Sequence, residues 1–160
     1  MLCMENRKIK NATPKEYNGI KFKSLAEVMV YKTLLQQGFN PQYESETFHI
    51  WEGFIPNKVP FYTRNTFNRK NKNIEVISDT TVKDNRPLQD ITYTPDFIFY
   101  YNSIKVIVEV KGLQNDVFPY KFKMFRKYLE RQNEPYMLWE IFTKKQLLEC
   151  INLLKKSAFQ

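Results

Sequence analysis

Two carboxylates and a lysine interrupt the otherwise apolar and aromatic segment YTPDFIFYYNSIKVIVEVKG, which covers residues 93–112. Side chains alternate between the two faces of a strand, so Glu109 and Lys111 are neighbours on one face, roughly 6–7 Å apart along the chain. Asp96 lies just upstream, in the strand expected to pair with this one across a turn near Asn102. A strand that serves only packing does not need these charges. The alternative is an ordinary surface ion pair between Glu109 and Lys111.

These three side chains suit metal-assisted chemistry on a phosphate. Two carboxylates brought close together repel, and one of them keeps its proton unless a cation lies between them. Mg²⁺ takes oxygen ligands, usually one or two carboxylates together with substrate phosphate. Beside such an ion, Lys111 could hold a phosphate oxygen or orient a water molecule. The pattern therefore predicts a Mg²⁺ site at Asp96 and Glu109, which Mn²⁺ could also fill.

Hydrophobic periodicity and capping residues predict the elements that position these groups. Ser24 is the expected N-cap of the first helix and Gly38 follows its last turn, while residues 1–19 are expected to be an extended polar segment. The order αβββαβα predicts an α/β (α+β) domain with a central mixed sheet flanked by helices. The expected elements are a helix over 24–37, a strand over 43–51, a strand pair over 93–101 and 103–111, a helix over 119–132, a strand over 136–142 and a last helix capped by Thr143.

The length of 160 residues fits one domain, with a core over about 22–156 and an insertion over 53–91. The insertion is rich in Pro and Asn, which break the regular pattern. Within it, residues 60–70 and 73–82 are predicted to form two strands of a hairpin.

The string YTPDF followed by a hydrophobic strand and EVKG resembles the signature of the PD-(D/E)xK nuclease superfamily. In detail it is similar to the phage endonuclease I type, the Holliday-junction-resolving enzymes. The resemblance covers about residues 22–142 and is strongest over 93–113. It implies a restriction-endonuclease-like core in which Asp96 and Glu109 bind the metal, the main-chain carbonyl of Val110 is a further ligand, and Lys111 is the catalytic lysine.

The superfamily also supplies an acid from the first core helix, and Glu27 is the candidate here. At 100° per residue, Glu27 lies among Val30, Tyr31, Leu34 and Leu35 on the most apolar side of that helix. A lone carboxylate there is costly without a partner or a metal. We therefore assign Glu27 as a third acid, the alternative being a first-turn Glu stabilised by the helix dipole.

Basic residues indicate a polyanionic partner. The formal net charge is +8, and the stretch between Phe54 and Ile74 carries five basic residues and no acid, with aromatic residues interleaved. Such a segment can follow a phosphate backbone, although a solvated hairpin is the alternative. One lysine of the 119–132 helix also resembles basic residues that relatives place near the scissile phosphate. The residues expected to contact nucleic acid are Lys58, Arg64, Arg69, Lys70, Lys72 and Lys121.

The predicted function is a metal-dependent endodeoxyribonuclease acting on branched or Holliday-junction DNA. The resemblance implies cleavage that leaves 5′-phosphate and 3′-hydroxyl ends. A sequence-specific homing or restriction-type endonuclease of the same superfamily is the next reading. Two further alternatives are a DNA-binding module with an inactive site and a nuclease that acts on RNA.

The remaining composition favours a cytoplasmic protein. No stretch approaches the roughly 18 consecutive apolar residues of a membrane helix, and the first ten residues do not resemble a signal peptide. Cys3 and Cys150 form neither a metal-ligand pair nor a disulfide framework, which favours a reducing compartment. The resemblance points to a bacterial host cell and a phage-encoded protein, and it leaves a homodimer open. The single histidine, His49, is interpreted as structural.

Overall fold

The computed structural model describes residues 14–66, 72–112 and 117–157. The chain forms two compact units, which are described separately below. The first unit combines residues 1–48 with residues 93–160, and the second covers residues 49–92. The insertion expected over 53–91 falls within the second unit.

The first unit has a central sheet of four strands in the order β11-β10-β9-β3. Strands β10 and β11 are parallel, whereas β9 is antiparallel to both of its neighbours, β10 and β3. The predicted mixed α and β class with a mixed central sheet is therefore confirmed. The elements of this unit are β1 (Lys15–Tyr17), β2 (Ile20–Phe22), α1 (Leu25–Gln36), β3 (Gln42–Tyr43), β9 (Phe97–Tyr101), β10 (Ile104–Val110), α2 (Phe118–Leu129), β11 (Tyr136–Ile141) and α3 (Lys144–Ser157).

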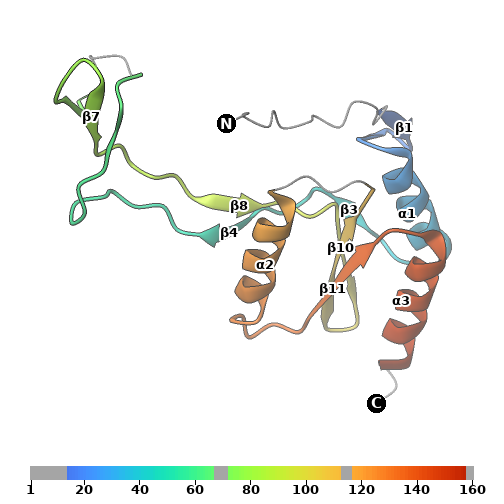
Figure 1. Ribbon diagram of the computed structural model, residues 1–160. Helices are drawn as coiled ribbons and strands as arrows, with labels where there is room; N and C mark the ends of the chain where they lie inside the picture. Colours follow the sequence, from blue (N-terminus) through green and yellow to red (C-terminus); the bar gives the residue numbers. More distant parts are fainter. Residues whose placement is uncertain (1–13, 67–71, 113–116, 158–160) are drawn as a thin grey trace. The chain divides into compact units, whose positions relative to one another are not determined.

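Helices cover both faces of this sheet: α2 lies against one face, and α1 and α3 lie against the other (Figure 1). Val106 and Val108 of β10 point toward α1 and α3 and belong to the main apolar core. Side chains alternate along β10, so Lys105, Ile107 and Glu109 point to the opposite face, which α2 covers. All three of these side chains are buried, which places two charged groups inside the protein.

Local sequence signals account for the helix ends. The Ser24 side chain accepts a hydrogen bond from the Glu27 amide and caps α1, and Gly38 adopts a positive φ of 86° just past the helix. Pro119 lies in the first turn of α2, where its missing N–H is not needed. Thr143 accepts a hydrogen bond from the Gln146 amide at 3.2 Å and caps α3 as predicted.

The hairpin that carries the candidate site is also confirmed. Tyr101 pairs with Ile104, and Phe97 pairs with Val108. Asn102 makes the turn with a positive φ of 54°, a conformation that Asn tolerates better than most residues.

The segment before α1 differs from the expected extended chain, because residues 15–22 form the antiparallel hairpin of β1 and β2. Asn18 and Gly19, with φ values of 51° and 76°, make its turn. Asn-Gly is the favoured pair for a two-residue hairpin turn, so the sequence did carry this signal.

The single strand expected over 43–51 is divided in two. Strand β3 ends at Tyr43, and β4 (Phe48–Trp51) begins a separate two-stranded sheet with β8 (Ile91–Tyr93). Glu44 has a positive φ of 43°, which turns the chain away from the central sheet. Its side chain pairs with Lys23, and its amide donates to the Asp96 carbonyl at 2.9 Å.

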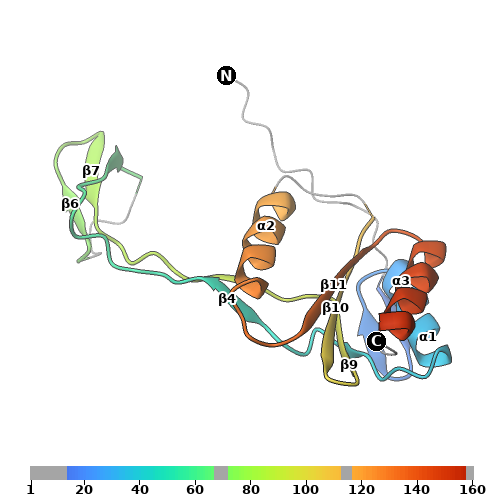
Figure 2. The ribbon, with the colours of Figure 1, turned by 90° about the horizontal axis from the view of Figure 1, so that it is seen from below.

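The second unit contains a three-stranded sheet with the order β5-β7-β6 (Figure 2). These strands are β5 (Tyr62–Arg64), β6 (Ile74–Val76) and β7 (Thr81–Asp84). The predicted hairpin between 60–70 and 73–82 is wrong, because β7 pairs with both other strands and separates them. The turn is made inside 73–82, where the Ser78 hydroxyl accepts hydrogen bonds from the Thr80 and Thr81 amides.

Among the helices that the structure describes, none is long and apolar enough to cross a membrane.

Candidate active site

Glu109 and Lys111 form an ion pair at the end of β10. Glu109 Oε1 lies 2.6 Å from Lys111 Nζ, and the two side chains are only 9% and 16% exposed. An ordinary surface ion pair would be solvated and would contribute little. Here both charges are largely removed from water, which costs free energy that other interactions must offset.

Helix α2 positions Lys111. The Lys111 ammonium lies over the ring of Phe118, the first residue of α2, at 3.5 Å from the ring centroid. A cation over an aromatic face is attracted to the ring quadrupole. Lys111 is therefore fixed from two sides, by Glu109 on its own strand and by Phe118.

Asp96 lies immediately before β9. The register of the β9–β10 hairpin, continued by one residue, places Asp96 across from Glu109. Asp96 Oδ2 accepts a hydrogen bond from the Val110 amide at 2.7 Å. That bond ties the carboxylate to the end of β10, beside the Glu109–Lys111 pair.

Burial and neighbouring charges raise the pKa of Asp96 to about 7. Burial is the largest cause, and the Glu109 carboxylate is the next. The Val110 amide and the Lys111 charge act in the opposite direction, and the charge of Glu27 adds to the increase. Two acids that share a buried site in this way would be stabilised by a cation between them.

Glu27 is buried on α1, as expected, but its carboxylate already has protein partners. It accepts hydrogen bonds from the Ser24 hydroxyl at 2.8 Å, the Lys23 amide at 2.9 Å and the Tyr43 hydroxyl at 2.6 Å. Burial, followed by the hydrogen bond to Glu27, raises the pKa of Tyr43. These bonds account for the burial of Glu27 without a metal, so its role as a third acid remains a prediction.

The Glu109 carboxylate is incompletely satisfied. Glu109 Oε2 and the Tyr93 hydroxyl are both buried, and neither makes a hydrogen bond of good geometry to a described residue. Burial raises the pKa of Tyr93, and the nearby Glu109 charge raises it further. A hydrogen bond between the two side chains adds to this increase, so the Tyr93 hydroxyl and the Glu109 carboxylate interact with each other.

The donor set at this point fits Mg²⁺ in kind. Asp96 and Glu109 offer hard carboxylate oxygens, and Glu109 Oε2 is buried without a hydrogen bond of good geometry to a described residue. Within the described ranges, no group of three or more His, Cys, Asp and Glu residues is arranged to hold a metal. The site thus presents two carboxylates, with any further ligands left to main-chain oxygen, substrate and water.

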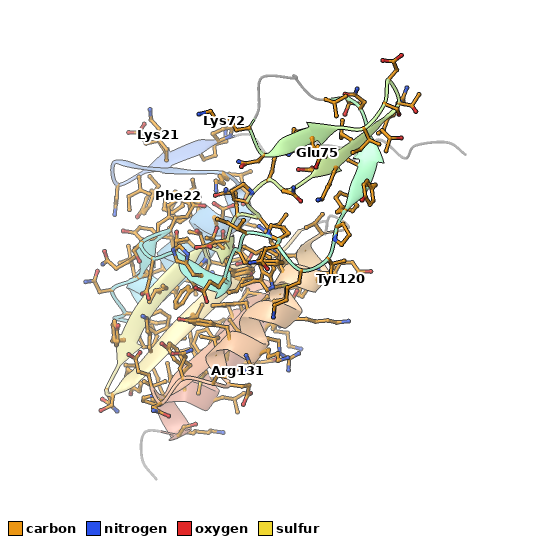
Figure 3. The ribbon with its side chains drawn as sticks, turned by 90° about the vertical axis from the view of Figure 1, so that its left-hand side faces the viewer. Lys21, Phe22, Lys72, Glu75, Tyr120 and Arg131 are labelled. Atoms are coloured by element: carbon orange, nitrogen blue, oxygen red, sulfur yellow. The ribbon has the colours of Figure 1, made fainter. Side chains whose placement is uncertain are left out.

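The predicted nucleic-acid contacts are distributed over both units. Lys58, Arg64 and Lys72 are exposed on the second unit, and Lys72 is labelled in Figure 3 together with Glu75 of β6. Arg69 and Lys70 lie outside the described residues. Lys121 lies on α2, the helix that also carries Phe118, and is half-buried.

An apolar groove on the second unit was not anticipated from the sequence. It has a volume of about 660 Å³, and Lys58 is one of the residues that line it. Phe54 and Phe61 line it and are about half exposed. The alternation of polar and apolar residues in this segment is too irregular to have indicated a groove.

His49 pairs with Asp90 in the second unit. His49 Nδ1 lies 2.6 Å from Asp90 Oδ2, and Asp90 also accepts a hydrogen bond from the Gly53 amide at 2.8 Å. The Gly53 bond and then His49 lower the pKa of Asp90. The pair links β4 to the segment before β8.

Comparisons with known proteins add no assignment, since no family model, curated protein or solved structure matches this chain. The functional reading therefore depends on the sequence motif and on the geometry of these side chains.

Sequence reasoning missed two side chains that contact the site. The sequence motif assigns no role in the site to Phe118 or to Tyr93. The available signal was proximity: Tyr93 begins the YTPDF string, and Phe118 follows Lys111 by only seven positions.

Proposed function

We propose that this protein is a metal-dependent endodeoxyribonuclease that hydrolyses phosphodiester bonds, with branched or Holliday-junction DNA as its preferred substrate. The observation that carries the proposal is the group of Asp96, Glu109 and Lys111 at the end of β10, where Glu109 is buried and the other two side chains are partly buried. The buried Glu109 Oε2 makes no hydrogen bond of good geometry to a described residue, which is consistent with a cation binding there. The junction preference depends on the sequence resemblance alone.

In this proposal, Asp96, Glu109 and the Val110 carbonyl would hold Mg²⁺, with Glu27 contributing from α1. When bound, the ion would lower the pKa of a water molecule and neutralise charge on the phosphate. The Lys111 ammonium would stabilise negative charge on a phosphate oxygen. Phe118 and Glu109 keep Lys111 in place, so little reorganisation is needed when the substrate arrives.

The first prediction concerns metal removal. Cleavage of supercoiled plasmid should require Mg²⁺ or Mn²⁺ and should stop in excess EDTA, because oxygen donors supply the site. Zn²⁺, which prefers nitrogen and sulfur ligands, should support cleavage poorly. The measurement is conversion of supercoiled to nicked and linear plasmid with each ion. Cleavage that continues in EDTA would remove the metal mechanism.

Substrate preference can be tested directly. Four-way junction, flap, duplex and single-stranded DNA, each end-labelled, would be compared at equal salt on a denaturing gel. Faster cleavage of the junction supports the proposed substrate. Cuts at one duplex sequence would support the homing or restriction-type alternative, and an RNA hairpin in the same panel tests for a ribonuclease.

A second prediction concerns the exposed basic residues of the second unit. Replacing Lys58, Arg64 and Lys72 with Ser should weaken DNA binding for many sequences alike if each contacts a phosphate. Each lost contact should reduce the slope of log K against log salt by roughly 0.7–0.9, so three contacts should reduce it by about 2–3. The measurement is a salt titration of binding by fluorescence anisotropy.

The matched control for that titration replaces three exposed lysines of α3 with Ser, namely Lys144, Lys145 and Lys156. Both triple variants lose the same charge, so only a true interface should change the slope. Equal slopes in the two variants would show that the second unit's basic residues are merely solvated.

A non-catalytic DNA-binding protein is the second candidate function. It is favoured by the complete set of hydrogen bonds to Glu27 and by the lack, in the described parts of the chain, of a three-acid metal group. It predicts salt-sensitive DNA binding with no cleavage in Mg²⁺ or Mn²⁺. The plasmid assay above therefore separates the two functions.

A further inference from the structure

The apolar groove of the second unit gathers exposed apolar side chains in one place. Phe54, Phe61 and Leu88 line it and are about half exposed, and Val59, which also lines it, is 77% exposed. Apolar residues that form one exposed patch mark a binding site far more often than single exposed residues do. The volume of about 660 Å³ is in the range of pockets that hold a ligand of nucleoside size.

Main-chain hydrogen bonds hold the walls of this groove. The Phe54 amide donates to the Leu88 carbonyl at 3.0 Å, and the Leu88 amide donates back at 2.8 Å. Gly53 allows this close approach, because a Cβ there would clash with the Leu88 carbonyl oxygen. The Phe61 carbonyl accepts a hydrogen bond from the Asp84 amide at 2.9 Å. A ligand can therefore bind between these walls with little further ordering of the backbone.

The charges at the groove favour an anionic ligand. Lys58 lines it, and Asp84, which also lines it, forms an ion pair with Arg86 at 2.8 Å. The charge of this acid is thus compensated within the protein, and the lining keeps a net positive charge. Basic residues continue along the chain after Lys58, and the sequence contains no acid before Glu75. Phosphates of a nucleic acid strand would complement this charge.

An unpaired nucleobase suits both the walls and the charge. Every base has a flat aromatic face that can stack on a phenylalanine ring, and its phosphates attract cations. Trp51 meets Phe54 edge to face, with ring centroids 5.7 Å apart, and within the described residues no ring stacks on Phe61. An apolar peptide would also fit the walls but would give Lys58 no partner. The bases of an intact duplex are already stacked inside the helix, so the ligand must be single-stranded.

We propose that this groove binds an unpaired base of single-stranded DNA against the rings of Phe54 and Phe61, with Lys58 beside a neighbouring phosphate. The inference rests on the proposed function in taking DNA as the partner. It deepens that function, because it names unpaired nucleotides at a strand end or a branch point as the part of the substrate that the second unit recognises.

The first test changes the DNA and leaves the protein intact. Wild-type protein is titrated by fluorescence anisotropy in EDTA, which prevents cleavage, with a blunt duplex and with the same duplex carrying a single-stranded overhang. The overhang should strengthen binding by about tenfold or more, the usual gain from stacking one base. An overhang of abasic sites keeps the phosphates but lacks the bases, and it should lose this gain. Equal binding of the abasic and normal overhangs would overturn the inference.

The second test is the double variant Phe54→Leu and Phe61→Leu, which removes both rings and keeps apolar side chains. It should bind the overhang about tenfold or more weakly than the wild type, and it should bind the blunt duplex equally well. The fluorescence of a 2-aminopurine in the overhang should be quenched by the wild type and much less by the variant. Tyr62→Leu is the matched control, because Tyr62 is similarly exposed in the same unit but does not line the groove. It should change neither measurement.

Two results with these variants would also overturn the inference. One is an equal loss of overhang binding in Tyr62→Leu and in the double variant. The other is a wild-type dimer that the double variant converts to a monomer in sedimentation, since a second copy of the chain would then occupy the groove. Overhang binding is measured without cleavage, so its failure leaves the metal-dependent activity standing. Intact overhang binding with no cleavage in Mg²⁺ or Mn²⁺ would instead overturn the nuclease function alone.

Discussion

Lys111→Ala and Glu109→Gln should each reduce DNA cleavage by at least about 10²-fold, the usual cost of removing a group that stabilises transition-state charge. Lys111→Ala removes the ammonium that would stabilise charge on the phosphate in the proposed mechanism. Glu109→Gln keeps the shape of the side chain but removes the negative charge that would bind the cation. The measurement is the single-turnover cleavage rate of a four-way junction at saturating protein.

Measuring DNA binding distinguishes a variant that has lost only the chemical step from one that has lost binding as well. In Ca²⁺, Lys111→Ala should bind DNA nearly as well as the wild type, because one buried lysine contributes little to a large phosphate interface. Lys105→Met is the matched control: Lys105 lies on the same face of β10, is buried, and forms an ion pair at 2.6 Å with the more exposed Glu46. Its folded fraction should cleave normally. Near wild-type cleavage by Lys111→Ala would exclude the proposed mechanism.

The placement of Asp96, Glu109 and Lys111 beside one another was predictable because these residues are close in sequence. Period-two alternation placed Glu109 and Lys111 on one face, and the turn at Asn102 brought Asp96 back to the end of β10. The 2.6 Å ion pair and the hydrogen bond from the Val110 amide agree with that reasoning. Burial could not be predicted in the same way, because it depends on α2 covering the face that carries the charges.

Glu27 shows where sequence reasoning stops. Its helical position correctly placed it among apolar residues, and its burial on α1 is confirmed. The helical pattern could not predict the contact with Tyr43. This residue lies sixteen positions further along the chain, in β3, and its hydroxyl donates a hydrogen bond to Glu27. This tertiary contact explains the burial of the Glu27 carboxylate without a metal ion, and it is therefore an alternative to the predicted role in metal binding.

The second unit was the least predictable part of the fold. Its strands have three or four residues each, and Val82 is its one fully buried apolar side chain among those described. Because this unit has so little apolar core, its turns decide which strands pair, and the hydrophobic pattern of the sequence does not. The turn at Ser78–Thr81 joins β6 to β7, so 73–82 is not one strand, and only its last residues pair with β5.

Asp96→Asn should make the metal-free protein more stable at pH 8 while abolishing its activity. The pKa of Asp96 is about 7 in the folded protein against an ordinary value of 3.8. The folded state therefore binds this proton more tightly than the unfolded state. The stability that the protonated carboxyl contributes is complete below about pH 4 and is lost as the pH rises toward 7.

An asparagine at this position keeps an oxygen for the Val110 amide but never acquires the buried charge. The difference in free energy of unfolding between Asp96→Asn and the wild type should thus grow by roughly 2–3 kcal/mol between pH 5 and pH 8. Denaturant unfolding at the two pH values in EDTA measures it. Cleavage should fall by about 10²-fold or more, because the neutral amide is a poorer ligand for the cation.

Asp84→Asn is the control, because the folded protein lowers the pKa of Asp84 whereas it raises the pKa of Asp96. Arg86 lowers the pKa of Asp84 through hydrogen bonds, so this carboxylate is ionised in both states throughout pH 5–8, and the stability difference should not grow with pH. Mg²⁺ should stabilise the wild type at pH 8 and have little effect on Asp96→Asn, because the ion compensates the buried charge that the variant lacks. A difference for Asp96→Asn that is constant with pH would mean that Asp96 ionises normally, and the electrostatic argument for a cation at this site would then fail.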